Sequence, residues 1–147
     1  MRGKLILVYW LPAILWAAAI LAASSDAFSA RETGSLLESV ITRLLGHPLP
    51  PHQFDLMHFV IRKGGHLTAY GILGALFFRA LRGAEGWWRG RWAAGAVALA
   101  AIVATADEWH QIFVPARIGT GWDVLLDCVG ATIAQGFWRL RAKEGGG

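Results

Sequence analysis

The sequence predicts an all-α integral membrane protein, and three observations lead to this fold class. Hydrophobic residues make up 55% of the 147-residue chain, while charged residues make up only 16%. A soluble domain carries about 25% charged residues, so this chain lacks the polar surface that water requires. Four segments are apolar over roughly the 20 residues that a helix needs to cross a bilayer. We therefore expect one domain, residues 1–147, built as a membrane-embedded four-helix bundle with an additional amphipathic interfacial helix.

The first predicted span covers residues 5–23 and follows two basic residues, Arg2 and Lys4. Pro12 would kink this helix without preventing its insertion. A cleaved signal peptide is the alternative, because Ala22–Ser24 are small residues of the kind that a signal peptidase accepts. The apolar run is longer than the core of a signal peptide, about 7–15 residues, and this favours a retained helix.

A polar interval, residues 24–61, comes next and contains an amphipathic helix over residues 35–45. Leucine, valine and isoleucine recur there at helical spacing, and polar side chains fill the opposite face. Thr33 or Ser35 is the candidate cap at its start, and Gly46 marks its end. This helix is too short to span a bilayer, so we expect it to lie on the membrane surface or to cover the bundle as a lid.

Three further spans are predicted at residues 62–81, 92–113 and 122–140. The segment between the first two of these, residues 82–91, is basic and rich in tryptophan, as is typical of the headgroup level of a membrane. The positive-inside rule therefore predicts that both termini and this segment lie in the cytoplasm. His58, just ahead of the second span, is expected in an exposed loop.

Ionisable and amide side chains gather at one end of these three spans, and we call them the polar cluster. Its members are Arg62, Lys63, His66 and Tyr70 on the second span, Asp107, Glu108, His110 and Gln111 on the third, and Arg117, Asp123 and Asp127 just before or on the fourth. Residues four apart share one face of a helix, so each span turns a polar stripe toward its neighbours. A charge in hydrocarbon costs several kcal/mol, so charges kept there pair with one another or form a site.

The polar cluster resembles the pattern of the VanZ-like family of small bacterial membrane proteins. The matching pieces are Arg62-Lys63-x-x-His66-x-x-x-Tyr70-x-x-Leu73-Gly74, then Asp107-Glu108-x-x-Gln111-x-Phe113-x-x-x-Arg117-x-x-x-x-x-Asp123, then Gly130. Asn is common in that family where this chain has Asp127, so a role that needs a neutral amide is not implied there. The resemblance implies a multi-span protein of the bacterial cell envelope, in the inner membrane. The founding member is linked to resistance to teicoplanin, a lipid-bearing glycopeptide antibiotic.

The sequence leaves more than one use of the polar cluster open. In a structural use, its cations and carboxylates pair and tie three helices together. In a binding use, the cluster opens to the outer leaflet and holds an amphiphilic envelope ligand, such as a lipid-linked precursor, a phospholipid headgroup or teicoplanin. Arg62, Lys63 and Arg117 would then hold a phosphate or carboxylate. Tyr70 and Trp122 would line the apolar flank of the pocket.

A catalytic use is the alternative, namely a membrane-embedded hydrolase or transferase that acts on a lipid phosphate. His66, Asp107 and Glu108 are the candidate acid–base residues. The candidate ligands of a divalent metal are His66, Glu108, His110 and Asp123. Glu108 and His110 are two residues apart and point in different directions on a helix, so we expect no metal and no cofactor. The expected partner is membrane lipid, and nucleic acid is excluded because its binding needs a basic stripe on a soluble face.

Overall fold

All regular structure in the computed structural model is helical across the residues it describes, 2–24, 30–85, 88–112 and 121–144. The helices are α1 (Arg2–Ala23), α2 (Ala30–Leu45), α3 (Pro51–Arg82), α4 (Gly90–Ile112) and α5 (Gly121–Glu144). No strand occurs within these described ranges. The all-α fold class predicted from the composition is therefore confirmed.

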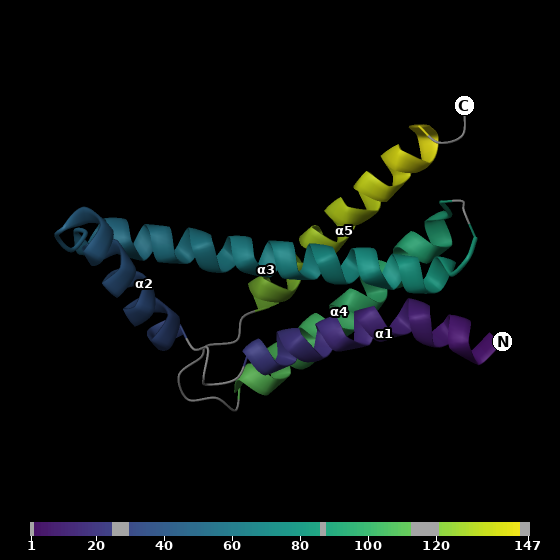
Figure 1. Ribbon diagram of the computed structural model, residues 1–147, viewed down its shortest axis with the longest axis horizontal. Helices are drawn as coiled ribbons and strands as arrows, with labels where there is room; N and C mark the ends of the chain where they lie inside the picture. The colour runs from purple at the N-terminus through teal and green to yellow at the C-terminus, as the bar shows by residue number, and fades with distance from the viewer. Residues whose placement is uncertain (1, 25–29, 86–87, 113–120, 145–147) are drawn as a thin grey trace.

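The central helix is α3, and each of the other helices packs against it (Figure 1). Its most extensive contact is with α5, and α4 packs against both of them. Figure 1 shows α2 folding back along the first part of α3, beyond the ends of the other helices. The bundle therefore consists of α1, α3, α4 and α5, and α2 lies to one side of it.

Small residues allow the helices of the bundle to approach one another closely. A Cβ added at Gly74 of α3 would lie 2.8 Å from the Cα of Ala131 on α5, which leaves no room for a side chain. Gln135 bridges the same two helices, because its Nε2 donates to the carbonyl oxygen of Gly74 at 3.0 Å. Aromatic residues of α3 and a row of alanines on α4 complete the core, which includes Tyr70, Phe77, Phe78, Ala96, Ala100 and Ala104.

The amphipathic helix is longer than predicted. It begins at Ala30, so Thr33 and Ser35 lie inside α2 rather than at its cap. Alanine, arginine and glutamate, which form its first turn, are among the strongest helix formers, and this explains the extension. The predicted end is correct: Gly46 adopts a φ of 76°, and its N–H donates to the carbonyl oxygen of Thr42 at 2.9 Å.

The second predicted span, residues 62–81, is only part of a longer helix, since α3 begins at Pro51. Proline suits the first helical position because it has no N–H to leave unbonded there, and Pro50 before it is extended, with φ −54° and ψ 138°. His58 consequently lies on a helix and is half-buried, which corrects our expectation of an exposed loop. Its ring stacks on Phe54, with centroids 5.9 Å apart.

Within the described residues, one segment is long and apolar enough on its own to cross a membrane: Ile6–Ala23 of α1. The other predicted spans fall on α3, α4 and α5, which have sufficient length but carry the ionisable residues of the polar cluster. Those residues lower the mean hydropathy of each helix. Hydropathy of the helices thus supports one of the four predicted spans.

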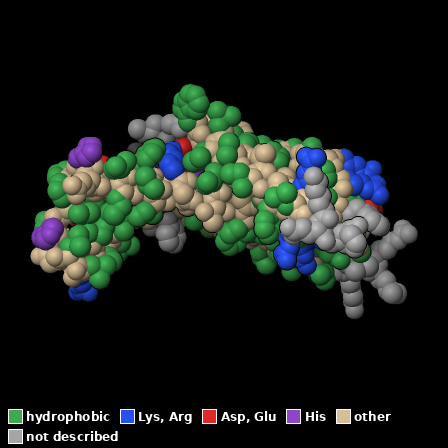
Figure 2. Space-filling model, turned by 90° about the horizontal axis from the view of Figure 1, so that it is seen from above, with side chains coloured by type: hydrophobic (Ala, Val, Ile, Leu, Met, Phe, Trp, Pro, Cys, Tyr) green, Lys and Arg blue, Asp and Glu red, His purple; other side chains and the backbone are tan. Residues whose placement is uncertain are grey.

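The end of the bundle that carries many Lys and Arg side chains, which we call the basic end, lies apart from the polar cluster. The start of α1, the turn between α3 and α4 and the end of α5 lie at the same end of the molecule (Figure 1). Figure 2 shows several Lys and Arg side chains near that end, while hydrophobic side chains spread over much of the visible face. The far end of α1, the end of α4 and the start of α5 meet around the middle of α3 (Figure 1).

Candidate functional site

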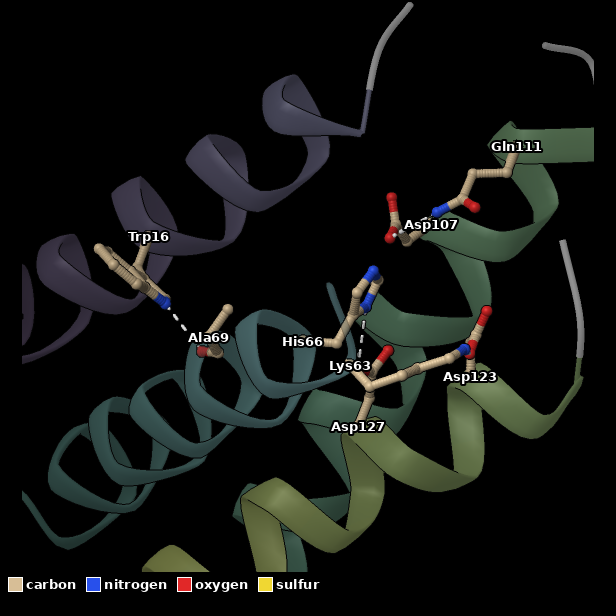
Figure 3. Close-up of polar contacts among 8 residues, drawn as sticks. All are labelled: Trp16, Lys63, His66, Ala69, Asp107, Gln111, Asp123 and Asp127. Atoms are coloured by element: carbon tan, nitrogen blue, oxygen red, sulfur yellow. Dashed lines mark hydrogen bonds and ion pairs between the residues drawn. The ribbon is translucent and has the colours of Figure 1, made fainter. Parts of the chain in front are cut away.

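Two side-chain contacts join α3 to α5 in the polar cluster (Figure 3). Lys63 pairs with Asp123, and one turn further along both helices His66 Nδ1 lies 3.3 Å from Asp127 Oδ1. Lys63 and His66 are three residues apart on α3, and Asp123 and Asp127 are four apart on α5, so the two contacts lie one above the other. Asp127 is only 1% exposed. A buried carboxylate of this kind needs a partner, and His66 supplies one.

The third helix of the cluster, α4, contributes Asp107, Glu108 and Gln111, all of them buried. Gln111 Nε2 donates to Asp107 Oδ2 at 3.0 Å. Figure 3 places the His66 ring between Asp107 on α4 and Asp127 on α5. The carboxylates of both helices are close enough to His66 to act on it electrostatically. The structure therefore brings polar stripes from three helices together around one imidazole.

Tyr70 lies one turn after His66 on α3 and packs against it. Its ring stacks on His66, with centroids 6.5 Å apart and an angle of 5° between the planes. The residue is 1% exposed, and its hydroxyl makes no hydrogen bond to the described part of the protein. Oδ1 of Asp107 is buried and without a hydrogen bond in the same way. An unbonded buried polar atom costs about 1–3 kcal/mol. Pairing between the helices therefore does not account for every polar atom of the cluster.

Other predicted members lie elsewhere. His110 is exposed, and Trp122, expected on the apolar flank of a pocket, is 78% exposed. Arg117 lies outside the described residues. Arg62 is half-buried, forms no ion pair within the described residues and lines a separate cavity. In the part of the chain that the structure describes, no three His, Cys, Asp or Glu side chains are arranged to hold a metal ion.

The separate cavity was not predicted. It has a volume of about 390 Å³ and lies between the end of α1, the start of α2 and the middle of α3. Its basic side is formed by His58, Arg62 and His66, and its apolar side includes Ile20 of α1 and Leu37 of α2. The amphipathic pattern of residues 35–45 indicated a covering helix, but no sequence signal indicated which helices it would cover.

His66 connects the cavity with the polar cluster. It lines the cavity, and on the other side it contacts Asp127. Tyr70 also lines the cavity and is buried near the carboxylates of Asp107, Glu108 and Asp127. A molecule in the cavity would therefore lie beside an imidazole that already contacts the buried carboxylate of Asp127. On the α1 side the cavity is held in shape by Trp16, whose Nε1 donates to the carbonyl oxygen of Ala69 at 2.9 Å.

Comparison with known proteins bears on the same residues. The family model described as VanZ/LLP1 matches residues 8–142, a range that includes the cavity and the polar cluster. No curated protein and no solved structure matches the chain. The family and the apolar segment of α1 together indicate a membrane protein. With a match that spans nearly the whole chain, this protein belongs to the VanZ/LLP1 family.

Proposed function

We propose that this protein crosses the bacterial inner membrane four times and binds an amphiphilic envelope ligand in the cavity between α1, α2 and α3. The observation that carries the proposal is the cavity itself, because its basic side and apolar side match the two halves of an anionic amphiphile. Its volume of about 390 Å³ falls in the range of small-molecule sites. The ligand classes are a lipid-linked precursor, a phospholipid headgroup and a lipoglycopeptide such as teicoplanin.

The surface of α5 supports a span there despite its charges. One face of this helix presents large apolar side chains at nearly every turn, each at least half exposed: Leu125, Val129, Ile133, Phe137 and Leu140. The opposite face carries the buried residues Asp123, Asp127 and Gln135. A helix with its apolar face outward and its polar face inward suits lipid and not water. The same argument explains why hydropathy alone does not recognise the span.

The distribution of basic residues supports the orientation. Arginines at the end of α3, just before and at the start of α4, and near the end of α5 lie at the end of the bundle where α1 starts. They are Arg82, Arg89, Arg91, Arg139 and Arg141. By the positive-inside rule this end, with both termini, is cytoplasmic. The cavity lies at the opposite end of α1 and so opens toward the outer leaflet.

The chemistry of the lining supports an anionic ligand with an apolar part. Arg62 offers a planar guanidinium group, which can bind phosphate or carboxylate through paired N–H donors. His58 adds a buried Nε2 that makes no hydrogen bond within the described residues. Ile20, Leu37 and Ile61 offer apolar contact to an acyl chain. Lys63, which we expected to share this role, is engaged with Asp123 instead.

Binding to the purified protein in lipid nanodiscs tests the proposal. The probes are fluorescently labelled teicoplanin, a labelled lipid-linked cell-wall precursor and a labelled phospholipid. Arg62→Gln should weaken binding of the preferred probe about tenfold, the effect of losing one charge-assisted hydrogen bond. Arg43→Gln is the matched control, because it removes the same charge from an exposed position on α2 away from the cavity. Failure of all three probes to bind, or equal effects of the two variants, would reject the proposal.

A second candidate function, hydrolysis or group transfer on a lipid phosphate, is favoured by one observation. His66 faces the cavity and contacts Asp127 at 3.3 Å, and a His–Asp pair beside a ligand is a common acid–base arrangement. Asp107 and Glu108 lie nearby as further carboxylates. Phosphate release from a lipid-linked pyrophosphate, lost in His66→Gln, is the expected result for an enzyme. Binding with neither phosphate release nor any change in the mass of the lipid would exclude hydrolysis and transfer and leave the binding function.

A further inference from the structure

The size of the cavity between α1, α2 and α3 limits which part of a ligand can enter it. Sites for drug-sized molecules have volumes of about 300–1,000 Å³, and this cavity, at about 390 Å³, lies near the lower limit. The headgroup of a phospholipid, a phosphate with a short substituent, is smaller than a drug-sized molecule. The sugar–peptide part of a lipid-linked precursor and the glycopeptide core of teicoplanin are each much larger. Of the three ligand classes, the phospholipid headgroup is therefore the one that the cavity can hold whole.

The position of the apolar wall also suits a phospholipid. Ile61 lines the cavity and is 52% exposed, so the apolar wall continues onto the outer surface of α3. In a phospholipid the phosphate joins a small headgroup to the acyl chains, so the headgroup can enter while the chains stay on that surface. In a lipid-linked precursor the phosphates stand between the sugar and the lipid chain, and the sugar would have to enter with them.

The charges around the cavity discriminate among phospholipids. Arg62 brings a guanidinium group that forms no ion pair within the described residues. The lining residues that the structure describes include no Asp or Glu. Asp127, behind the His66 ring, is 1% exposed and already contacts that ring. The ammonium group of an ethanolamine or choline headgroup would therefore lie near a cation without a carboxylate to pair with it.

Hydrogen-bonding groups in the lining match a headgroup that carries hydroxyls. Ser24, just after the end of α1, lines the cavity and is 5% exposed. Its hydroxyl group can donate and accept hydrogen bonds, as can the hydroxyls of a glycerol headgroup. His58 also lines the cavity, and its Nε2 makes no hydrogen bond to any part of the protein that the structure describes. These two side chains suit an uncharged polar substituent on the phosphate.

We propose that the ligand is an anionic phospholipid whose headgroup carries hydroxyls and no positive charge, the class of phosphatidylglycerol. This inference rests on the proposed function, since it names the ligand of the same cavity. The phosphate pairs with Arg62, and the glycerol lies in the cavity with Ser24 and His58. The acyl chains follow the exposed side of Ile61. The protein should therefore discriminate between two phospholipids of similar size by the charge of their headgroups.

The experiment uses the full chain in nanodiscs of phosphatidylcholine that also contain equal amounts of phosphatidylglycerol and phosphatidylethanolamine with the same acyl chains. Native mass spectrometry counts the lipids of each kind that stay bound after release from the disc. The parent chain should retain phosphatidylglycerol at least about tenfold better than phosphatidylethanolamine, the difference expected for one charge-assisted contact. Arg62→Gln should lose most of this preference, whereas Arg43→Gln, at an exposed position of α2, should keep it. Phosphatidylglycerol held at the basic end is common to all three proteins, so the difference between them reports the cavity.

Failure of this inference can be distinguished from failure of the proposed function. Equal retention of the two phospholipids by the parent chain, or an equal preference in Arg62→Gln and Arg43→Gln, would overturn the inference. If labelled teicoplanin or the labelled precursor then binds in a manner that depends on Arg62, the proposed binding function stands with a different ligand. If binding of no probe depends on Arg62, both fall. Circular dichroism establishes that Arg62→Gln is folded, and the comparison of the two lipids on the parent chain needs no variant.

Discussion

Gly130 of α5 lies directly against the carbonyl group of Leu67 on α3. A Cβ at residue 130 would stand 2.3 Å from that oxygen and 3.2 Å from the backbone nitrogen of Gly71. Leu67 follows His66 in the sequence, and Gly130 lies about one turn after Asp127. This close approach of the two helices therefore adjoins the contact between His66 and Asp127, and it limits how far apart those two side chains can lie.

Gly130→Ala should destabilise the protein by about 2–3 kcal/mol, because the new methyl group forces α5 away from α3. Gly136→Ala on the same helix is the control. A Cβ at that residue has nothing within 4 Å, and alanine there should stabilise the helix by up to about 1 kcal/mol. Thermal unfolding in detergent, followed by circular dichroism, measures both. Equal midpoints for the two variants would show that the helices do not pack as closely as described.

The ion pair between Lys63 and Asp123 should contribute to holding α3 against α5. The carboxylate side chain is 10% exposed and the lysine side chain 32%, so solvent screens the pair only in part. Lys63→Ala should cost about 1–3 kcal/mol by leaving Asp123 unpaired. In an Asp123→Ala background the same change should cost much less, and a double-mutant cycle measures the difference. Additive effects would mean that the pair contributes nothing to stability.

The sequence predicted which polar residues share a helix face, because a period of 3.6 residues fixes that geometry. Lys63 and His66, three residues apart, lie on one side of α3, and their partners Asp123 and Asp127, four residues apart, lie on one side of α5. The pairing of α3 with α5 was also foreseeable in part, since the glycines of residues 71–74 and Gly130 mark close helix contacts.

Other features depend on how helices meet, and a single sequence does not encode them locally. The cavity needs the end of α1 and the start of α2 to converge on α3. Arg62 lines this cavity, whereas Lys63, the next residue, points to another face of α3 and pairs with Asp123. The early start of α3 was missed because residues 51–61 were assigned to the polar interval ahead of the second span. Proline is favoured at the first position of a helix, although it interrupts a helix in the interior.

Asp127 stands where asparagine is common in the VanZ-like pattern. Its contact with His66 predicts how the stability of the protein differs between aspartate and asparagine at residue 127. Asp127→Asn keeps an oxygen that can accept from His66, so stability should change by less than about 1 kcal/mol. Asp127→Ala leaves the half-buried imidazole of His66 without its partner and should cost about 1–3 kcal/mol. Thermal unfolding of the parent chain and of the two variants gives the order of their stabilities. If asparagine destabilises as much as alanine, the charge of Asp127, and not the hydrogen bond, is what the fold requires.

Two adjacent glycines allow the cavity to be blocked without disturbing the bundle. Gly65 lines the cavity and Gly64 does not, and a Cβ at either residue meets nothing within 4 Å. Gly65→Phe should place a ring in the cavity and weaken binding of the amphiphile about tenfold or more, because the ring and the ligand compete for one volume. Gly64→Phe adds the same side chain on a different face of α3 and should leave binding within about twofold of the parent. Both variants replace a glycine inside a helix, so neither should lose helix stability. Titration of each variant with the preferred labelled probe gives the comparison, and a ligand that binds both equally well must occupy some other part of the molecule.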